Sequence, residues 1–199
     1  AGGAGACWAC RVMPVKVLRA SGSGSASDVA AGITWAVDHG ADVVSLSLGG
    51  GGITALKNAV QYAEDHGVPV VAAAGHDARS LVQYPAGYPT AVSVGATDRN
   101  DNRASYSNYG SWVRLAAPGT SEAMQRTGVI KPDYTGTSAA TPLVSGTIGL
   151  MLTEDPALTP TQIRSILMST ADPAGIPLAP GTGQPPCVDK RRVAATKAS

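Results

Sequence analysis

One serine stands between small residues directly before an apolar stretch. Residues 134–142 read YTGTSAATP with Ser138 at the centre, and the apolar stretch of residues 139–152 is helical in character. A serine in the first turn of a helix faces unpaired backbone N–H groups and the positive end of the helix dipole. Because these groups stabilise negative charge, the segment suits a nucleophile whose attack creates an oxyanion. Alternatively, Ser138 is only a helix N-cap, a position where serine is common.

Strand-like and helix-like segments alternate along the chain with short connections. The pattern predicts strands over residues 11–18, 43–47, 68–74, 90–97 and 113–116. It predicts helices over residues 28–39 and 54–66, from Ser138 onward, and from 160 to about 170. This alternation indicates an α/β fold of three layers, a mostly parallel sheet with helices on both faces.

Particular capping residues set the expected helix boundaries. Ser27 is the expected N-cap of the first helix, and Gly40 and Gly67 stand where a glycine commonly ends a helix. Thr159 and Pro160 are the expected N-cap and first residue of the last helix.

An open parallel sheet also predicts where a site would lie. Ligands bind beyond the carboxyl ends of the strands in such sheets. The Ser/Gly-rich loops after Leu18, Ser47 and Ala74 are therefore expected at one edge, where the helix start at Ser138 can meet them.

The composition excludes several classes of function. The chain has 199 residues and a net charge of +1, so it carries no electrostatic footprint for nucleic acid. Its longest apolar run, residues 68–74, is too short to cross a membrane. No signal peptide is visible, and the first residues look like a cut through a longer chain. We expect residues 1–172 to form one domain and residues 173–199 a Pro/Gly-rich tail.

Three cysteines leave the redox chemistry open. Cys7 and Cys10 form a Cys-x-x-Cys pair, and Cys187 lies near the other end. The pair could be half of a zinc site or a redox-active dithiol. A local disulfide or two packed thiols is favoured, because no second ligand pair exists and the pair precedes an expected strand.

A glycine-rich loop offers a different class of function. Residues 22–27 read GSGSAS after an expected strand and open a helix, as a dinucleotide-binding fingerprint does. Ser27 replaces the third glycine of that fingerprint, and no acidic residue ends the next strand to bind a ribose. Nucleotide binding is therefore a minor alternative.

The segment around Ser138 resembles the nucleophile motif of the subtilisin-like serine proteases (subtilases), Gly-Thr-Ser-Met-Ala-x-Pro, with Ala139 where Met is common. Several other segments fit this family in the same order: residues 41–50, 70–75, 84–86, 94–97, 106–110 and 115–119. The resemblance covers about residues 13–171 and implies a subtilisin-like fold truncated at its N-terminus.

The resemblance also implies roles for individual residues. Ser138 would be the nucleophile, and an exposed strand edge would bind an extended polypeptide substrate as an added strand. The residues expected to align the substrate are Ser47, Leu48 and Gly49. Those expected to line the specificity pocket, where small side chains leave room for a large apolar group, are Ala73, Ala74 and Gly75.

The catalytic triad of the family, Asp, His and Ser in that order, is incomplete here. The family's Asp-Thr/Ser-Gly and His-Gly-Thr-His motifs do not occur, and the 3 histidines are His39, His66 and His76. A serine hydroxyl is a poor nucleophile without a neighbouring base. We therefore expect little or no turnover from this chain alone, and the missing N-terminal segment is an expected partner.

A second departure concerns the oxyanion. The family places Asn after Ala-Ala-Gly to donate a hydrogen bond, and this chain has His76 there. Losing that donor costs about 10²–10³ in turnover, a range that comes from subtilisin itself. His76 is a catalytic candidate because its ring N–H can donate; alternatively, the substitution has no special role.

Two functions follow from the resemblance. The chain is interpreted as a catalytic-domain fragment of a serine endopeptidase that forms an acyl-enzyme on Ser138, inactive in isolation. The alternative is a peptide-binding pseudoprotease that lacks the general base. The resemblance implies an extracellular, secreted protein. No cofactor is expected: family members often bind calcium, but Asp98, Asp101 and Asp133 form no recognisable calcium loop.

Overall fold

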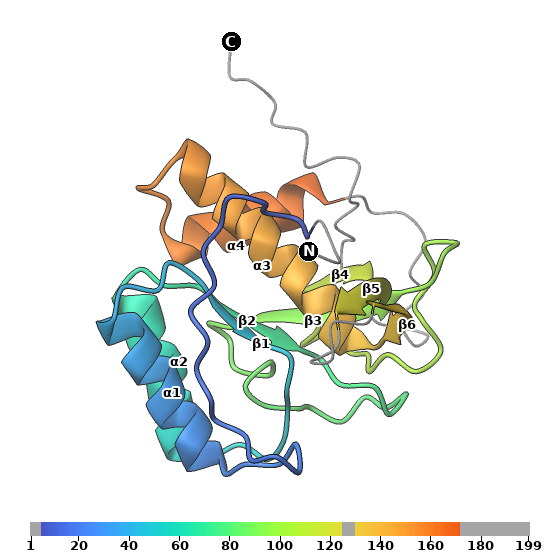
Figure 1. The fold of residues 1–199 in the computed structure, drawn as a ribbon, viewed down its shortest axis with the longest axis horizontal. Coiled ribbons are helices and arrows are strands. Elements are labelled where there is room, and N and C mark those ends of the chain that lie inside the picture. The colour runs from blue at the N-terminus through green and yellow to red at the C-terminus, as the bar shows by residue number, and fades with distance from the viewer. Residues whose placement is uncertain (1–4, 125–129, 172–199) are drawn as a thin grey trace.

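A parallel sheet is the centre of the computed structural model, which describes residues 5–124 and 130–171 (Figure 1). Its strands lie in the order β1 (Val44–Leu46), β2 (Val70–Ala73), β3 (Val92–Thr97) and β4 (Leu115–Pro118). The helices are α1 (Ala26–Asp38), α2 (Thr54–Asp65), α3 (Thr137–Glu154) and α4 (Pro160–Thr170). An antiparallel hairpin of β5 (Thr120–Met124) and β6 (Ile130–Thr135) leads into α3.

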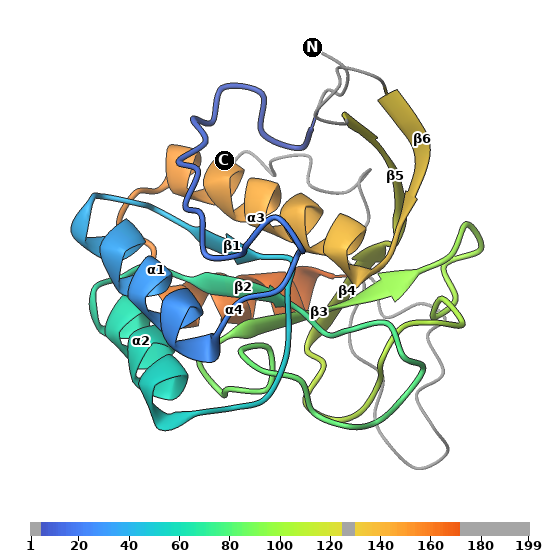
Figure 2. The same cartoon turned by 60° about the horizontal axis from the view of Figure 1, so that its bottom comes forward.

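The helices form layers on the two faces of the sheet. Figure 2 shows α1 and α2 side by side on one face and α3 on the other. Because side chains alternate along a strand, Val70 and Ala72 join the apolar cluster of α1 and α2, whereas Val71 joins the cluster of α3 and α4. The expected three-layer α/β fold is confirmed.

The first expected strand, residues 11–18, is wrong. Val15 and Val17 pack beside α1, and the Val17 side chain leaves no room for any residue but glycine at Gly32. Within the described residues, however, no strand pairs with this segment and none borders the outer edge of β1. Val12 is 88% exposed and Val15 and Val17 are only partly buried, so the expected burial is also incomplete, and a strand needs a backbone partner as well.

The expected glycines follow the ends of α1 and α2, but the expected N-cap of α1 is wrong. The N-cap of α1 is Ser25 instead of Ser27, because Ser25 forms a reciprocal capping box with Asp28 three residues later. Gly40 and Gly67, which follow α1 and α2, adopt φ of 80° and 79°, as expected of residues that end helices.

The last helix and the cysteine pair agree with the sequence. Thr159 caps α4 in a capping box with Gln162, and Pro160 is its first residue. Cys7 and Cys10 form a disulfide, so the local-bridge interpretation is confirmed. Cys187 and the expected tail lie outside the described residues, and the β5–β6 hairpin was not predicted.

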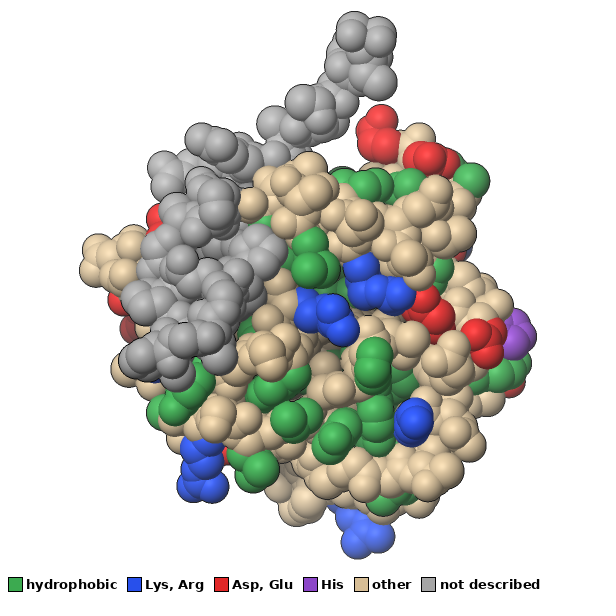
Figure 3. All heavy atoms as spheres, turned by 180° about the vertical axis from the view of Figure 1, so that it is seen from behind, with side chains coloured by type: hydrophobic (Ala, Val, Ile, Leu, Met, Phe, Trp, Pro, Cys, Tyr) green, Lys and Arg blue, Asp and Glu red, His purple; other side chains and the backbone are tan. Residues whose placement is uncertain are grey.

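Within the described residues, the face of the molecule shown in Figure 3 carries no large area of a single charge. On the face shown in Figure 3, Lys and Arg side chains are few and lie among acidic, apolar and uncharged ones. None of the helices within the described ranges has the length and apolar character that crossing a bilayer demands.

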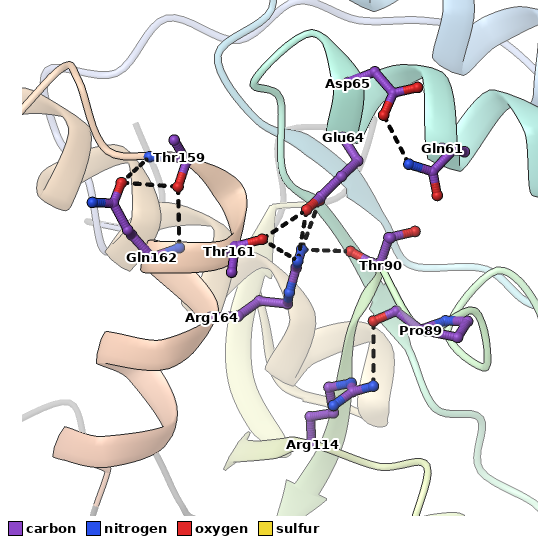
Figure 4. Close-up of polar contacts among 10 residues, drawn as sticks. All are labelled: Gln61, Glu64, Asp65, Pro89, Thr90, Arg114, Thr159, Thr161, Gln162 and Arg164. Atoms are coloured by element: carbon purple, nitrogen blue, oxygen red, sulfur yellow. Dashed lines mark hydrogen bonds and ion pairs between the residues drawn. The ribbon is translucent and has the colours of Figure 1, made fainter.

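A bidentate ion pair joins α4 to α2 (Figure 4). Arg164 donates to both carboxylate oxygens of Glu64, at 2.7 and 2.6 Å. The same guanidinium donates to the carbonyl oxygen of Thr90 and the hydroxyl of Thr161, both at 2.9 Å. Both charged side chains are only 15% exposed. The pair therefore lies mostly out of water and fixes α4 against the end of α2 and the start of β3.

Removing one partner of this pair should cost much more than replacing both. We expect Arg164→Met to lower the free energy of unfolding by about 3 kcal/mol, because the Glu64 carboxylate, only 15% exposed, loses its cationic partner. The double variant Glu64→Leu with Arg164→Met should lose less than Arg164→Met alone. Denaturant unfolding measures both, and equal losses in the two variants would contradict the ion-pair account.

Candidate functional site

Ser138 lies in the first turn of α3, at the carboxyl edge of the sheet. Gly136, the residue before the helix, has φ of 142°, and its N–H donates to the carbonyl oxygen of Gly119 at the base of the hairpin. This turn sends the chain from β6 into α3 (Figure 2). Thr137 and Ala139 are buried on either side of Ser138, which is itself half-buried. Its hydroxyl is thus presented from a fixed backbone at a helix N-terminus.

Two reciprocal hydrogen bonds join Ser138 to the end of β1. The Ser138 hydroxyl donates to the Ser47 carbonyl oxygen at 3.2 Å, and the Ser47 hydroxyl donates to the Ser138 carbonyl oxygen at 2.9 Å. The second bond has a cause in the sequence. Pro142 lies inside α3, four residues after Ser138, and has no N–H to donate to that carbonyl. Ser47 supplies the donor that the proline removes.

The turn after β2 contacts the residue before Ser138. The Gly75 N–H donates to the Thr137 hydroxyl oxygen at 3.1 Å, so Gly75–His76 and Thr137–Ser138 lie side by side. Gly75 has φ of 95°, a conformation that a side chain would strain. His76 is exposed. The loops after β1 and β2 therefore meet at the start of α3, as the sheet rule predicts.

The residues singled out for substrate binding differ in access. Ser47 and Gly49 are exposed, and Leu48 packs partly against the core. Ala73 and Ala74 are 3% and 0% exposed and lie beneath the surface, so Gly75 is the accessible member of that group.

The glycine-rich turn after β1 is anchored to a second loop. Gly50 and Tyr84 exchange two backbone hydrogen bonds of 2.9 and 3.0 Å. A side chain at Gly52 would lie 2.7 Å from the Tyr84 ring. Close approach to Tyr84 therefore explains the glycine at position 52.

The loop after Leu18 leads into α1. In the described part of the chain, the Ser21 and Ser23 hydroxyls bond to each other, and Ser25 and Asp28 cap α1. A close approach of Gly24 to Val17 explains one of its glycines without a nucleotide.

The other two histidines have structural positions. His39 and His66 are the C-cap residues of α1 and α2, as expected for helix ends. Each ring places Nδ1 2.7 or 2.8 Å from a carbonyl oxygen of the preceding turn, where only a protonated Nδ1 can donate. The rings lie against Trp35 and Tyr62, with centroids 3.9 and 4.0 Å apart. They therefore complete their own helices.

Several other ionisable groups lie in the loops around the site, among them Asp77 and Arg79 in the turn that contains His76. Tyr106 donates its hydroxyl to the carbonyl oxygen of Gly119, and burial raises the pKa of this phenol. The Asp98 carboxylate accepts from the N–H groups of Asn100 and Asn102 within its own turn. Among the described residues, no three His, Cys, Asp or Glu side chains gather as metal ligands would.

Sequence reasoning missed three residues that build this site. Thr137 and Pro142 lie inside the nucleophile segment but had no role assigned to them. Asn108 lies in a segment noted only for its resemblance, and the structure buries it beside Gly75. A proline four residues after a helix-start serine was a readable signal, because it removes one backbone donor. The contacts of Thr137 and Asn108 join loops that are far apart in the sequence, so no local signal could have indicated them.

Comparison with known proteins gives a consistent result. Residues 1–192 match a family described as the subtilase family. Halolysin of Haloferax mediterranei is 55% identical over 163 residues, which are 81% of this chain and 31% of halolysin. Subtilisin Savinase of Lederbergia lenta is 42% identical over 162 residues, 81% of this chain and 60% of that protein.

Solved structures agree with the sequence relatives. A cold-adapted subtilisin-like serine proteinase superposes with a TM-score of 0.74 at 42% identity, covering 78% of this chain and 58% of that one. A protease of Pseudoalteromonas arctica superposes with a TM-score of 0.83 at 34% identity, covering 95% and 63%. This chain thus spans less than two thirds of the length of each of these four proteins.

The account of Pro142 predicts coupling between two positions. We expect Ser47→Ala to lower the free energy of unfolding by about 1 kcal/mol, because the Ser138 carbonyl loses its donor. In a Pro142→Ala background the same change should cost little, since the introduced alanine supplies an N–H within the helix. A double-mutant cycle in denaturant measures the coupling. Additive effects would show that Ser47 does not replace the missing helix bond.

Proposed function

Since the chain belongs to the subtilase family, we propose that it is the nucleophile-bearing part of a serine endopeptidase. One observation carries the proposal: the Ser138 hydroxyl lies at the N-terminus of α3, between the end of β1 and the Gly75–His76 turn. Backbone N–H groups and the helix dipole at this position favour the negative charge that develops during acyl transfer.

The proposed reaction runs in two halves. The Ser138 Oγ attacks the carbonyl carbon of the scissile peptide bond and gives up its proton to a base. The resulting oxyanion accepts hydrogen bonds from the Ser138 N–H and the His76 ring N–H. Collapse breaks the C–N bond, the amine leaves with the proton, and an ester of Ser138 remains. Water hydrolyses that ester and restores the serine. The reaction calls for no cofactor, because the nucleophile is a side chain.

The base is the component that the described site does not supply. The Ser138 hydroxyl donates to the Ser47 carbonyl, which cannot take up a proton. His39 and His66 are held at the ends of α1 and α2. We propose that a segment outside these 199 residues brings the Asp and His motifs and pairs along the outer edge of β1. That edge has no partner strand within the described ranges, which supports the proposal.

The proposed substrate is a polypeptide in extended conformation. Ser47 and Gly49 are exposed after an edge strand, an arrangement suited to gripping a peptide backbone. Leu48 packs this loop against the core, and Gly75 is the partly exposed residue that follows the buried Ala73 and Ala74.

We propose that the protein acts outside the cell. The Cys7–Cys10 disulfide fits an oxidising compartment. A relative at 43% identity is named a cell wall-associated protease of Bacillus subtilis.

The second candidate function is a peptide-binding pseudoprotease. It is favoured by one observation: the Ser138 hydroxyl donates to a backbone carbonyl and not to a base.

A serine-reactive fluorophosphonate separates the two functions. We expect the chain joined to a segment with the Asp and His motifs to be labelled at Ser138, and Ser138→Ala to abolish the label. The chain alone should react about 10²–10⁴-fold more slowly, because a positioned base contributes that factor. A complemented chain that binds peptide yet resists labelling would establish the pseudoprotease.

The role of His76 is testable in the same complemented chain. We expect His76→Ala to lower turnover of a peptide substrate by about 10²–10³, the cost of an oxyanion donor as measured on subtilisin, a member of this family. His76→Asn should change turnover little, because the amide also donates. A hundredfold rise in His76→Asn would instead show that His76 does not serve this role.

A further inference from the structure

We propose that Asn108 is a positioning residue that holds the Gly75–His76 turn in place beside Ser138. The claim that Asn108 affects catalysis rests on the proposed function of Ser138. The claim that Asn108 holds the turn does not depend on that function. Asn108 lies in the loop between β3 and β4 and is 1% exposed. Among the described residues, its side chain forms hydrogen bonds with the turn after β2 and none with the Ser138 side chain.

The buried side-chain amide of Asn108 forms hydrogen bonds with three backbone groups of the turn after β2. The Asn108 Nδ2 donates to the carbonyl oxygen of Ala74 at 2.9 Å. The Asn108 Oδ1 accepts from the N–H groups of Asp77 and Arg79, at 3.0 and 3.1 Å. The Asn108 backbone N–H donates to the carbonyl oxygen of Gly75 at 3.0 Å. Four hydrogen bonds therefore wrap residues 74–79, with His76 at their centre, around one residue.

The backbone of Asn108 is itself fixed to the sheet. The neighbouring Ser107 hydroxyl accepts from the Ala96 N–H of β3 at 3.0 Å and donates to the Asn108 carbonyl oxygen at 3.1 Å. Arg103 donates to the Ser107 carbonyl oxygen at 2.6 Å. These bonds therefore connect the turn after β2, through Asn108 and Ser107, to β3, a central strand of the sheet.

The other side of the turn leads to the nucleophile. A side chain at Gly75 would lie 2.5 Å from the Asn108 Nδ2, so the backbone must approach the amide closely. From the same residue the N–H donates to the Thr137 hydroxyl, directly before Ser138. Asn108, Gly75 and Thr137 therefore form a continuous path from β3 to the start of α3.

Asparagine suits this position because both kinds of group are used. The site needs a donor for Ala74 and an acceptor for two N–H groups, and a neutral amide offers both. Aspartate keeps the acceptor but loses the donor, and leucine of similar size has neither. The His76 side chain makes no hydrogen bond of its own with the described residues, so its backbone determines where the ring can reach.

Two variants and one control test the assignment. Asn108→Leu removes all side-chain bonds, and Asn108→Asp keeps the two bonds from Asp77 and Arg79. The control variant, Arg164→Met, lowers stability by breaking the α4–α2 ion pair. Arg164 forms its hydrogen bonds with residues outside the turn after β2. The first readout is hydrogen exchange at the Asp77 and Arg79 amides in the chain as it exists. The second is the fluorophosphonate rate at Ser138 in the complemented chain.

We expect Asn108→Leu to speed exchange at both amides about tenfold, the factor of one ordinary hydrogen bond, while Asn108→Asp retains protection. The labelling rate should fall about a hundredfold in Asn108→Leu, as a small misplacement of catalytic groups predicts, and less in Asn108→Asp. Arg164→Met should leave both readouts unchanged despite its lower melting temperature.

Several outcomes would overturn the assignment. Unchanged exchange in Asn108→Leu would show that the amide does not hold the turn. Altered exchange with an unchanged labelling rate, or an equal fall in Arg164→Met, would show that the contact is structural only. If Asn108→Leu does not fold, Asn108→Asp still decides through its intermediate labelling rate. Failure to label the complemented wild type would refute the proposed hydrolysis, and the exchange rates would still decide whether Asn108 holds the turn.

Discussion

A backbone carbonyl that its own helix cannot satisfy determines how this site is built. Pro142 has no N–H, so the carbonyl of Ser138 needs a donor from outside α3. The Ser47 hydroxyl provides it at the end of β1. A carbonyl left without a partner costs more than one bond gains, so this donor constrains the distance between sheet and helix. The apolar packing of α3 on the sheet sets the layer, and this bond sets the position of Ser138 within it.

Parallel strand topology makes such a constraint useful. All four strands of the main sheet run the same way, so the loops after β1 and β2 leave at the same edge. Ser47 and Gly75 then contact Ser138 and Thr137 from two neighbouring loops. Small residues permit this crowding, because Gly75 has a positive φ and almost no free space at its Cα. The start of α3 is therefore fixed from two directions.

Much of this arrangement could be predicted from local patterns. Four of five expected strands, all four helices and the three-layer fold followed from apolar periodicity and from Gly, Ser, Thr and Pro at helix ends. The failures have physical causes. Residues 11–18 have the apolar pattern of a strand, but pairing depends on a neighbour that periodicity cannot report. The β5–β6 hairpin lacks a strong alternating pattern. The N-cap of α1 is Ser25 instead of Ser27 because Asp28, three residues after Ser25, completes a capping box with it.

The site shows the same division between local and long-range information. Ser138 stood out because a short segment contains both the serine and the helix that follows it. Asn108 did not, because its meaning depends on Ala74 and Asp77, about thirty residues away in the chain.

The edge of β1 connects the chemistry of the site to the folding of the sheet. β1 ends just before Ser47, whose carbonyl accepts the Ser138 hydroxyl, and its outer side has no strand within the described residues. An added strand there would satisfy the edge and lie next to the residue that contacts the nucleophile. A base delivered by that strand could accept the Ser138 proton, which a carbonyl cannot do. Pairing of the added strand with β1 and activation of Ser138 would then occur together, because both involve the backbone at the end of β1.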